Sequence, residues 1–204
     1  MKVTAIILAS GFSKRFNGNK LLAMYKEKPL IMHSVDKIIG QDFYEVMIVS
    51  QYDEVLELLK DTISSNPRVK AIKNNSPEKG MSESIKQGIK ASEDCDAYMF
   101  FVGDAPLIKE KTIEEMLSTF KGLDQSKVPI LCPVYEGQRG NPVIFSKQYK
   151  KELLNLTGDT GGRQIIARYN DCVVTYPITH QEELMDIDTV LDYKQLIQRK
   201  SIER

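Results

Sequence analysis

Short apolar runs, separated in the first half of the chain by segments of helical period, constrain the fold most strongly. The helical patterns lie around residues 31–39, 55–63 and 85–91. Strands that alternate with helices form βαβ units, so we expect an α/β fold: a three-layer, Rossmann-like, mostly parallel sheet with helices on both faces. The runs expected to be strands are 3–8, 46–49, 69–72, 98–102, 129–132, 142–145 and 172–176.

The same topology predicts where a ligand binds. Right-handed crossovers place the strand-to-helix loops on one edge of the sheet, and ligands bind there, at the carboxyl ends of the strands. The loops after Ala9, Lys73 and Val102 are therefore the candidate site. We expect one domain over 1–204 with two differently built halves, 1–120 and 121–204, because the polar stretch 121–129 precedes shorter, less regular strands.

The loop after Ala9 carries the residues that suit a polyphosphate. It reads SGFSKRFNGNK and combines glycine and serine with three cations directly after a buried strand. Backbone N–H groups and fixed positive charge at one point hold phosphate groups. Neither common phosphate motif is present: Phe16 stands at the second glycine position of G-x-x-x-x-G-K-[ST], and Ser13 at that of G-x-G-x-x-G. A basic surface turn is the alternative interpretation.

Two further loops supply a carboxylate and a helix start. Asp104 follows the strand at 98–102, where a carboxylate facing a phosphate loop is a natural magnesium ligand. The loop 74–84 leads through Gly80 and several serines into a helix whose first N–H groups suit a base or ribose. Capping of the following helix is the alternative role for both loops.

Composition excludes several classes of function. Lys plus Arg and Asp plus Glu each total 28, and a zero net charge argues against nucleic acid as the main partner. No apolar run approaches the roughly 18 residues of a membrane span, so we expect a cytoplasmic protein with no membrane partner. Cys95, Cys132 and Cys172 lie far apart and are expected to be buried free thiols.

Six ordered elements together resemble a known family. LASGFSKRFNGNK, GMSES and FFVGDAPLI are similar to elements of the nucleotidylyltransferases related to the guanylyl- and cytidylyltransferases of molybdenum cofactor synthesis. RGNP, GDTGGR and DIDT, at 139–142, 158–163 and 186–189, resemble the cytidylyl branch, which includes the molybdenum hydroxylase accessory proteins. The resemblance covers about 3–196 and implies the nucleotide-diphospho-sugar transferase type of fold.

The resemblance assigns roles to individual residues. It places Gly11, Ser13, Arg15 and Lys20 at the triphosphate, Leu8, Ala9, Gly80 and Ser84 around the cytosine and ribose, and Arg139, Asn141, Asp159 and Arg163 at the acceptor. Asp104 is implied as the Mg²⁺ ligand and Asp188 as a candidate second one, with Arg15, Lys20 and Asp104 acting in catalysis. Ser10 departs from the usual Ala or Gly close to the base, and Asn141 from a frequent histidine.

The implied reaction transfers CMP from CTP to a molybdopterin-type molybdenum cofactor, releases pyrophosphate and depends on Mg²⁺, with a molybdenum hydroxylase as a partner. The acceptor phosphate is already an anion, so no general base is needed, which agrees with a chain of only two histidines. Three alternatives stay open: GTP as the donor, a sugar phosphate or methylerythritol phosphate as the acceptor, and a carrier protein that binds the cofactor without catalysis.

Overall fold

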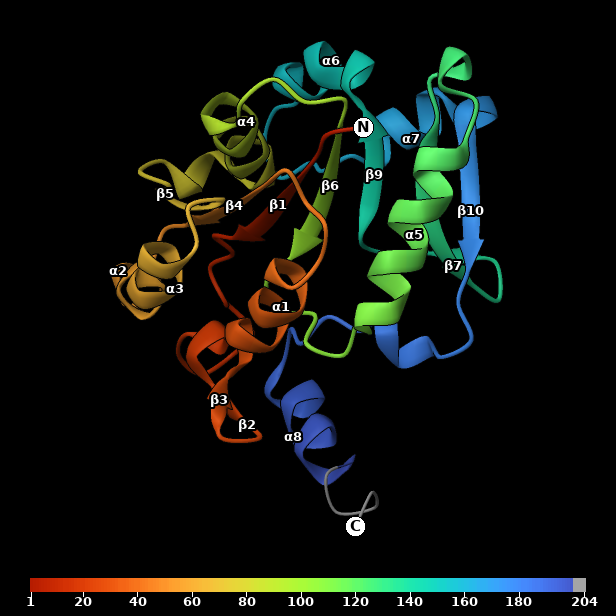
Figure 1. Cartoon of the computed structure of the whole chain (residues 1–204). Coiled ribbons are helices and arrows are strands. Elements are labelled where there is room, and N and C mark those ends of the chain that lie inside the picture. Colours follow the sequence, from red (N-terminus) through yellow and green to blue (C-terminus); the bar gives the residue numbers. More distant parts are fainter. Residues whose placement is uncertain (200–204) are drawn as a thin grey trace.

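The centre of the structure, a computed structural model that describes residues 1–199, is an eight-stranded mixed sheet (Figure 1). Two further short strands form a hairpin apart from it. The strands are β1 (Val3–Ala9), β2 (Met24–Tyr25), β3 (Lys28–Pro29), β4 (Glu45–Ser50), β5 (Val69–Lys73), β6 (Ala97–Val102), β7 (Ile130–Tyr135), β8 (Gln138–Arg139), β9 (Val143–Ser146) and β10 (Val173–Pro177).

Helices connect and cover these strands. The α-helices are α1 (Leu30–Ile39), α2 (Asp53–Leu58), α3 (Lys60–Ser65), α4 (Met81–Ala91), α5 (Glu110–Gly122), α6 (Lys150–Asn155), α7 (Arg163–Arg168) and α8 (Val190–Arg199). Short 3-10 helices lie at Lys20–Leu22, Pro77–Lys79, Gln125–Lys127, Lys147–Tyr149, Asn170–Cys172 and Gln181–Leu184.

The strand order is β10-β7-β9-β6-β1-β4-β5, with β8 paired to β7. Strand β1 runs parallel to both β4 and β6, and β4 runs parallel to β5. Strand β9 is antiparallel to its neighbours β6 and β7, so it joins the parallel first half to the remaining strands. One continuous sheet therefore runs through both halves of the chain.

Alternating side chains of the strands feed two cores, one on each face. On β1, Ala5 and Ile7 face a core formed with α1, α2, α3 and α5, whereas Ile6 faces one formed with α4, α6 and α7. All three side chains are fully buried. Strands covered on both faces read as continuous apolar runs, which is why β1, β4 and β6 are visible in the sequence.

The predicted fold class and all seven predicted strands are confirmed, with ends that differ by a few residues. The helical pattern at 55–63 is divided into α2 and α3 at Leu59, whose backbone angles of φ −88° and ψ −6° depart from those of a regular helix. The strands β2, β3 and β8 have only two residues each, too few to show a period. Their absence from the sequence prediction follows from that length.

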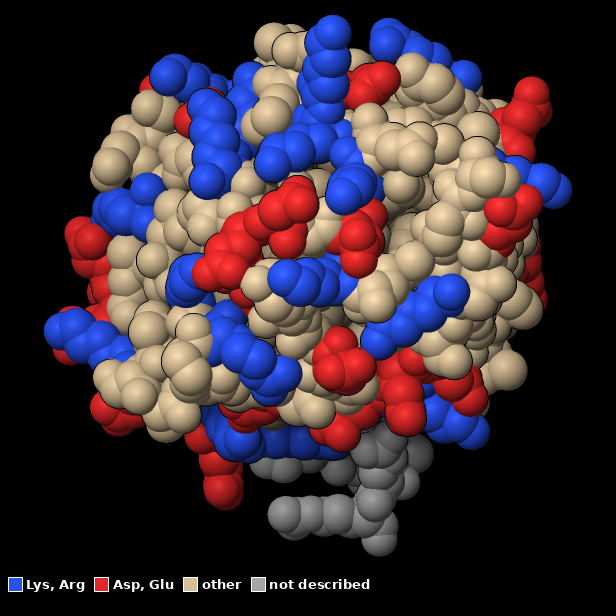
Figure 2. Space-filling view, turned by 45° about the horizontal axis from the view of Figure 1, so that its top comes forward, with Lys and Arg blue, Asp and Glu red and all other residues tan. Residues whose placement is uncertain are grey.

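The surface and the cysteines agree with the composition. Lys and Arg side chains are interspersed with Asp and Glu on the face shown in Figure 2, without a large area of one sign. No helix within residues 1–199 is long and apolar enough to cross a membrane. All three cysteines are free thiols, as expected; Cys95 and Cys132 are buried and Cys172 is partly buried.

The packing of α4 on β1 gives a test of the fold. A Cβ atom on Gly88 would lie 2.6 Å from Cγ2 of Ile6, a buried and β-branched side chain that cannot move aside. Alanine normally stabilises a helix interior by about 1 kcal/mol relative to glycine. Because overpacking outweighs this gain, Gly88→Ala should lower the free energy of unfolding by about 1–3 kcal/mol, measured by urea denaturation.

Gly122→Ala is the matched control. This glycine also lies in a helix, at the end of α5, but a Cβ atom there would meet no heavy atom within 4 Å. We expect the Gly122→Ala protein to be as stable as the parent or slightly more stable. Equal effects of the two substitutions would contradict the close packing of α4 on β1.

Candidate functional site

The three loops predicted to meet do so in one cleft at the carboxyl ends of β1 and β6, with a volume of about 530 Å³. From the predicted site residues, the cleft is lined by Leu8, Ser10, Gly11, Ser13, Arg15, Lys20, Gly80, Ser84, Asp104, Asp159 and Asp188. Further lining residues, which the sequence analysis did not select, are Phe12, Lys14, Pro77, Glu78, Met81, Val102 and Asp186.

The loop after β1 presents unused backbone donors to this cleft. Among the hydrogen bonds of residues 1–199, none is donated by the N–H groups of residues 11–15. Ser13 has a left-handed backbone conformation with φ 52°, and its carbonyl accepts from Phe16 N at 2.9 Å. A tight turn of free N–H groups beside Lys14 and Arg15 is the arrangement that binds phosphate oxygens.

Side chains from the end of β4 hold this loop in place. Gln51 Nε2 donates to the carbonyl oxygen of Ser10 at 2.8 Å, and Tyr52 Oη donates to that of Gly11 at 2.7 Å. In a trans peptide the N–H points opposite to the C=O, so these contacts turn the N–H groups of Gly11 and Phe12 the other way. Ser10 Oγ donates to Val49 O at 3.1 Å, so its hydroxyl is satisfied within the sheet.

An ion network occupies the floor of the cleft. Lys20 Nζ contacts Asp104 Oδ2 and lies 2.7 Å from Asp188 Oδ1, and Arg15 lies 2.8 Å from Asp188 Oδ2. The Lys20 side chain is only 8% exposed, against 69% for Arg15. Burial alone would lower the pKa of Lys20, but the charges and hydrogen bonds of both carboxylates outweigh it and raise that pKa. Hydrogen bonding from Lys20 is the main cause that lowers the pKa of Asp188.

Asp188 reaches this position although it is distant from Asp104 in the sequence. The N–H of Ile187 donates to the carbonyl oxygen of Asp104 at 2.9 Å, which fastens the 186–188 segment to the end of β6. Ile187 itself is fully buried. Asp192 then accepts from the N–H groups of Asp188 and Thr189, at 3.1 and 2.7 Å, and caps the start of α8.

Asp186 is a third carboxylate of the cleft, which sequence reasoning did not select. It stands two residues before Asp188, so the alternation of acidic residues in DIDT was the signal that could have found it. The protein around the cleft limits its solvation, and the negative charges of Asp104 and Asp188 add to this effect. Together they raise the pKa of Asp186 from 3.8 to about 7.

The first N–H groups of α4 are already engaged within the protein, contrary to our expectation that they face a ligand. Met81 N donates to Asp159 Oδ1 at 3.2 Å, and Ser82 N donates to the carbonyl oxygen of Gly158 at 3.3 Å. A Cβ atom on Gly80, where φ is 81°, would lie 2.5 Å from the backbone of Gly158 and Asp159. The 158–162 loop from the second half of the chain thus closes on the helix and walls the cleft. Gly80 and Ser84 still line it.

Four predicted site residues lie outside the cleft. Ala9 is buried at the end of β1, and its carbonyl accepts from Ser50 Oγ at 3.0 Å. Arg139 is exposed and donates to Asn170 Oδ1 at 3.0 Å. Arg163 is not a lining residue either, although its positive charge acts to lower the pKa of Asp186.

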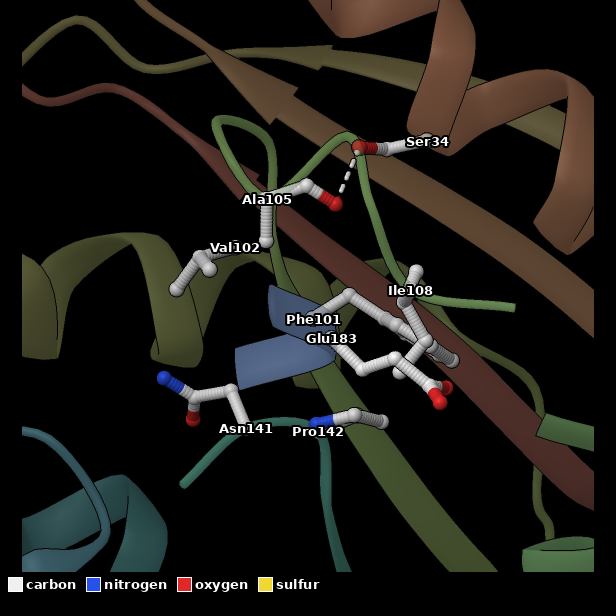
Figure 3. A pocket seen from close by; sticks show the side chains of 8 residues that line it. All are labelled: Ser34, Phe101, Val102, Ala105, Ile108, Asn141, Pro142 and Glu183. Atoms are coloured by element: carbon white, nitrogen blue, oxygen red, sulfur yellow. Dashed lines mark hydrogen bonds between the residues drawn. The ribbon is translucent and has the colours of Figure 1, made fainter. Parts of the chain in front are cut away.

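Asn141, the fourth of these residues, borders a separate small hollow (Figure 3). Its neighbours there include Pro142 and the buried Glu183, which accepts hydrogen bonds from Thr112 Oγ1 and Lys109 N at the start of α5. Val102 lines both this hollow and the cleft, so Asn141 lies next to the cleft rather than in it.

The cleft fits a divalent cation that a phosphate helps to bind. Asp104 and Asp188 already converge on a single cation, the Lys20 ammonium. Magnesium in phosphate-transfer sites is usually held by one or two carboxylates together with substrate phosphates and water. No group of three or more His, Cys, Asp or Glu within residues 1–199 is arranged to hold a metal ion. A carboxylate pair completed by a bound nucleotide agrees with both observations.

Comparison with known proteins places the chain among nucleotidyltransferases. The MobA-like NTP transferase domain matches residues 5–173. The molybdenum cofactor guanylyltransferase of Shewanella woodyi is 27% identical over 206 residues, covering 96% of each chain. The 2-C-methyl-D-erythritol 4-phosphate cytidylyltransferase of Dictyoglomus thermophilum is 28% identical over 117 residues, so the match spans 57% of this chain and about half (51%) of that relative.

A solved structure shares the fold. The manganese complex of a protein titled Rv0371C from Mycobacterium tuberculosis H37Rv superimposes with a TM-score of 0.73 at 16% identity, covering 97% of this chain and 99% of the other. The similarity extends over both halves of the molecule and includes the sheet on which the cleft is built.

The raised pKa of Asp186 predicts how stability depends on pH. A carboxyl whose pKa rises on folding contributes stability that is complete below its unfolded value, near 3.8, and lost as pH rises through about 7. In the absence of divalent cations, Asp186→Asn should remove this decline, so the variant gains stability relative to the parent between these pH values. Urea denaturation at a series of pH values measures the difference, and parallel profiles would contradict the raised pKa.

Proposed function

The chain belongs to the MobA-like NTP transferase family, and from this premise we propose that it transfers CMP from CTP to the phosphate of a molybdopterin-type molybdenum cofactor. An oxygen of the acceptor phosphate forms a bond to the α-phosphorus of CTP, and the bond from that phosphorus to the bridging oxygen breaks, so that pyrophosphate leaves. We also propose a molybdenum hydroxylase as the protein that receives the product.

The convergence of phosphate-binding and acidic groups in one cleft carries this proposal. The free N–H groups of residues 11–15 lie beside Arg15 and Lys20, and the carboxylates of Asp104 and Asp188 lie opposite. Two anions repel each other on approach, and charge builds on the departing pyrophosphate. Preorganised donors and cations reduce the repulsion between the anions and stabilise the charge on the pyrophosphate. This form of catalysis needs no group that exchanges a proton.

Each residue has a defined task in this scheme. Gly11 and Ser13 bind the phosphates through the loop, and Arg15 and Lys20 neutralise the β- and γ-phosphates. Asp104 and Asp188 are the residues that would hold Mg²⁺, which would supply Lewis-acid stabilisation of the phosphate oxygens. The manganese complex of the mycobacterial protein of the same fold supports a divalent cation in this architecture.

The elements RGNP, GDTGGR and DIDT support the proposed acceptor, because they resemble those of the cytidylyl branch. Of their residues, Asp159 and Asp188 line the cleft, whereas Arg139 and Arg163 lie outside it. We propose that the acceptor enters between the 158–162 loop and the 186–188 segment. Phe12 and Met81, both exposed in the cleft, add apolar surface on which a planar ring can stack.

GTP is the second candidate donor, and a specific observation favours it. The guanylyltransferase of Shewanella woodyi matches over nearly the whole chain, whereas the cytidylyltransferase of Dictyoglomus thermophilum matches over a shorter segment.

Pyrophosphate release tests these alternatives directly. The purified protein is incubated with Mg²⁺ and molybdenum-loaded molybdopterin, with CTP and GTP in parallel, and a second pair of reactions offers methylerythritol phosphate. We expect release with CTP and molybdopterin. Release with GTP but not with CTP would show that GTP is the donor. Release with methylerythritol phosphate but not with molybdopterin would show that the acceptor is methylerythritol phosphate. Molybdopterin binding without any release would indicate a carrier and contradict the enzymatic role.

Asp104→Asn tests the assignment of the carboxylate. The substitution keeps the shape of the side chain but removes the charge, so pyrophosphate release should fall by about 10²–10³-fold while the circular dichroism spectrum shows that the fold is retained. Asp42→Asn is the matched control, because Asp42 is 91% exposed and pairs with Lys121 away from the cleft. Near-normal turnover of the Asp104→Asn protein would rule out this role.

A further inference from the structure

The cations and two of the carboxylates of the cleft pair with one another. Two cations, Arg15 and Lys20, face two anions, Asp104 and Asp188. The two cations are differently placed: the Arg15 side chain is mostly exposed, whereas the Lys20 side chain is 8% exposed and its ammonium bridges both carboxylates. The groups that would bind metal and the group that would bind phosphate are therefore engaged with each other.

We propose that Lys20 is an internal counter-ion that blocks Asp104 and Asp188 toward a divalent cation until a triphosphate draws its ammonium away. The metal and the nucleotide then bind with positive cooperativity, and neither binds well alone. This inference rests on the proposed function, because it takes a nucleoside triphosphate and a divalent cation as the ligands of the cleft.

The position of Lys20 gives the physical reason. Its Nζ lies where the two carboxylates converge, so both carboxylates can bind a divalent ion only after the ammonium leaves. An ammonium displaced without an anion to receive it would remain buried and unpaired, which is strongly unfavourable. Binding of a metal ion without a nucleotide therefore leaves Lys20 buried and unpaired, which weakens the affinity for the metal.

A triphosphate removes that cost by exchanging partners. Phosphate oxygens bound to the loop at residues 11–15 offer Lys20 new anions, and the freed carboxylates accept the metal. Conversely, a triphosphate without metal would leave Asp104 and Asp188 unpaired beside further negative charge. Each ligand thus prepares the site for the other, and linkage requires the coupling to be equal in both directions.

Binding of Mn²⁺, followed by the electron paramagnetic resonance of the free ion, tests this proposal without turnover. In the absence of nucleotide, Lys20→Met should bind Mn²⁺ at least about tenfold more tightly than the parent, since removing one nearby positive charge shifts an affinity by this order. Lys20→Arg keeps the charge and should show no gain. Lys20→Met combined with Asp104→Asn should lose the gain.

Arg15→Met is the matched control, because Arg15 also pairs with Asp188 but is exposed to solvent. Exposed ion pairs contribute little, so its Mn²⁺ affinity should stay within about threefold of the parent. If Lys20→Met fails to fold, as judged by circular dichroism, Lys20→Gln replaces it. An Mn²⁺ affinity of the folded Lys20 variant equal to that of the parent would overturn the proposal.

A second titration, with a non-hydrolysable analogue of CTP or GTP, measures the coupling itself. The analogue should tighten Mn²⁺ binding to the parent about tenfold or more and tighten it much less in Lys20→Met. Pyrophosphate release by the parent, with unchanged Mn²⁺ affinity in the Lys20 variant, would overturn this inference and leave the proposed function standing. Tighter Mn²⁺ binding by the Lys20→Met protein, with no pyrophosphate release by the parent, would overturn the proposed function and leave the counter-ion role.

Discussion

The parallel pairing of β1 with β6 is the constraint on which the rest of the site depends. It places Leu8 opposite Val102, so the two strands end together and their loops leave at the same edge. The N–H of Gly103 continues the pairing by donating to Leu8 O at 2.9 Å, and a Cβ atom there would lie 3.2 Å from that of Ala9. Glycine at 103 thus allows Asp104 to face the phosphate-binding loop at close range.

Much of this arrangement could be predicted from the sequence because it follows from local patterns. Buried parallel strands are continuous apolar runs, and their carboxyl ends share an edge, which predicts that the loops after Ala9, Lys73 and Val102 lie together. Lys20 and Asp104 were both selected for that reason, and the structure places their charged groups in contact.

The features of the site that the sequence did not predict depend on contacts between distant segments, and such contacts leave no periodic pattern in the sequence. The closing of the 158–162 loop on the start of α4 removed the helix N–H groups that we had expected to face a ligand. Asp186 was missed because the burial that is the main cause of its raised pKa, and the nearby charge of Asp104, are not visible in the sequence around it. Arg139 was placed at the acceptor by resemblance alone, and its contact with Asn170, outside the cleft, has no counterpart in the local sequence pattern.

The tie between Ile187 and Asp104 also has a consequence for biosynthesis. A polypeptide leaves the ribosome from its N-terminus, so Lys20 and β6 are made well before the 186–192 segment that completes their surroundings. Until that segment emerges, Lys20 lacks one of its two carboxylate partners and Asp104 lacks the backbone contact beside it. The nascent chain therefore completes its central sheet before it acquires a finished ligand site.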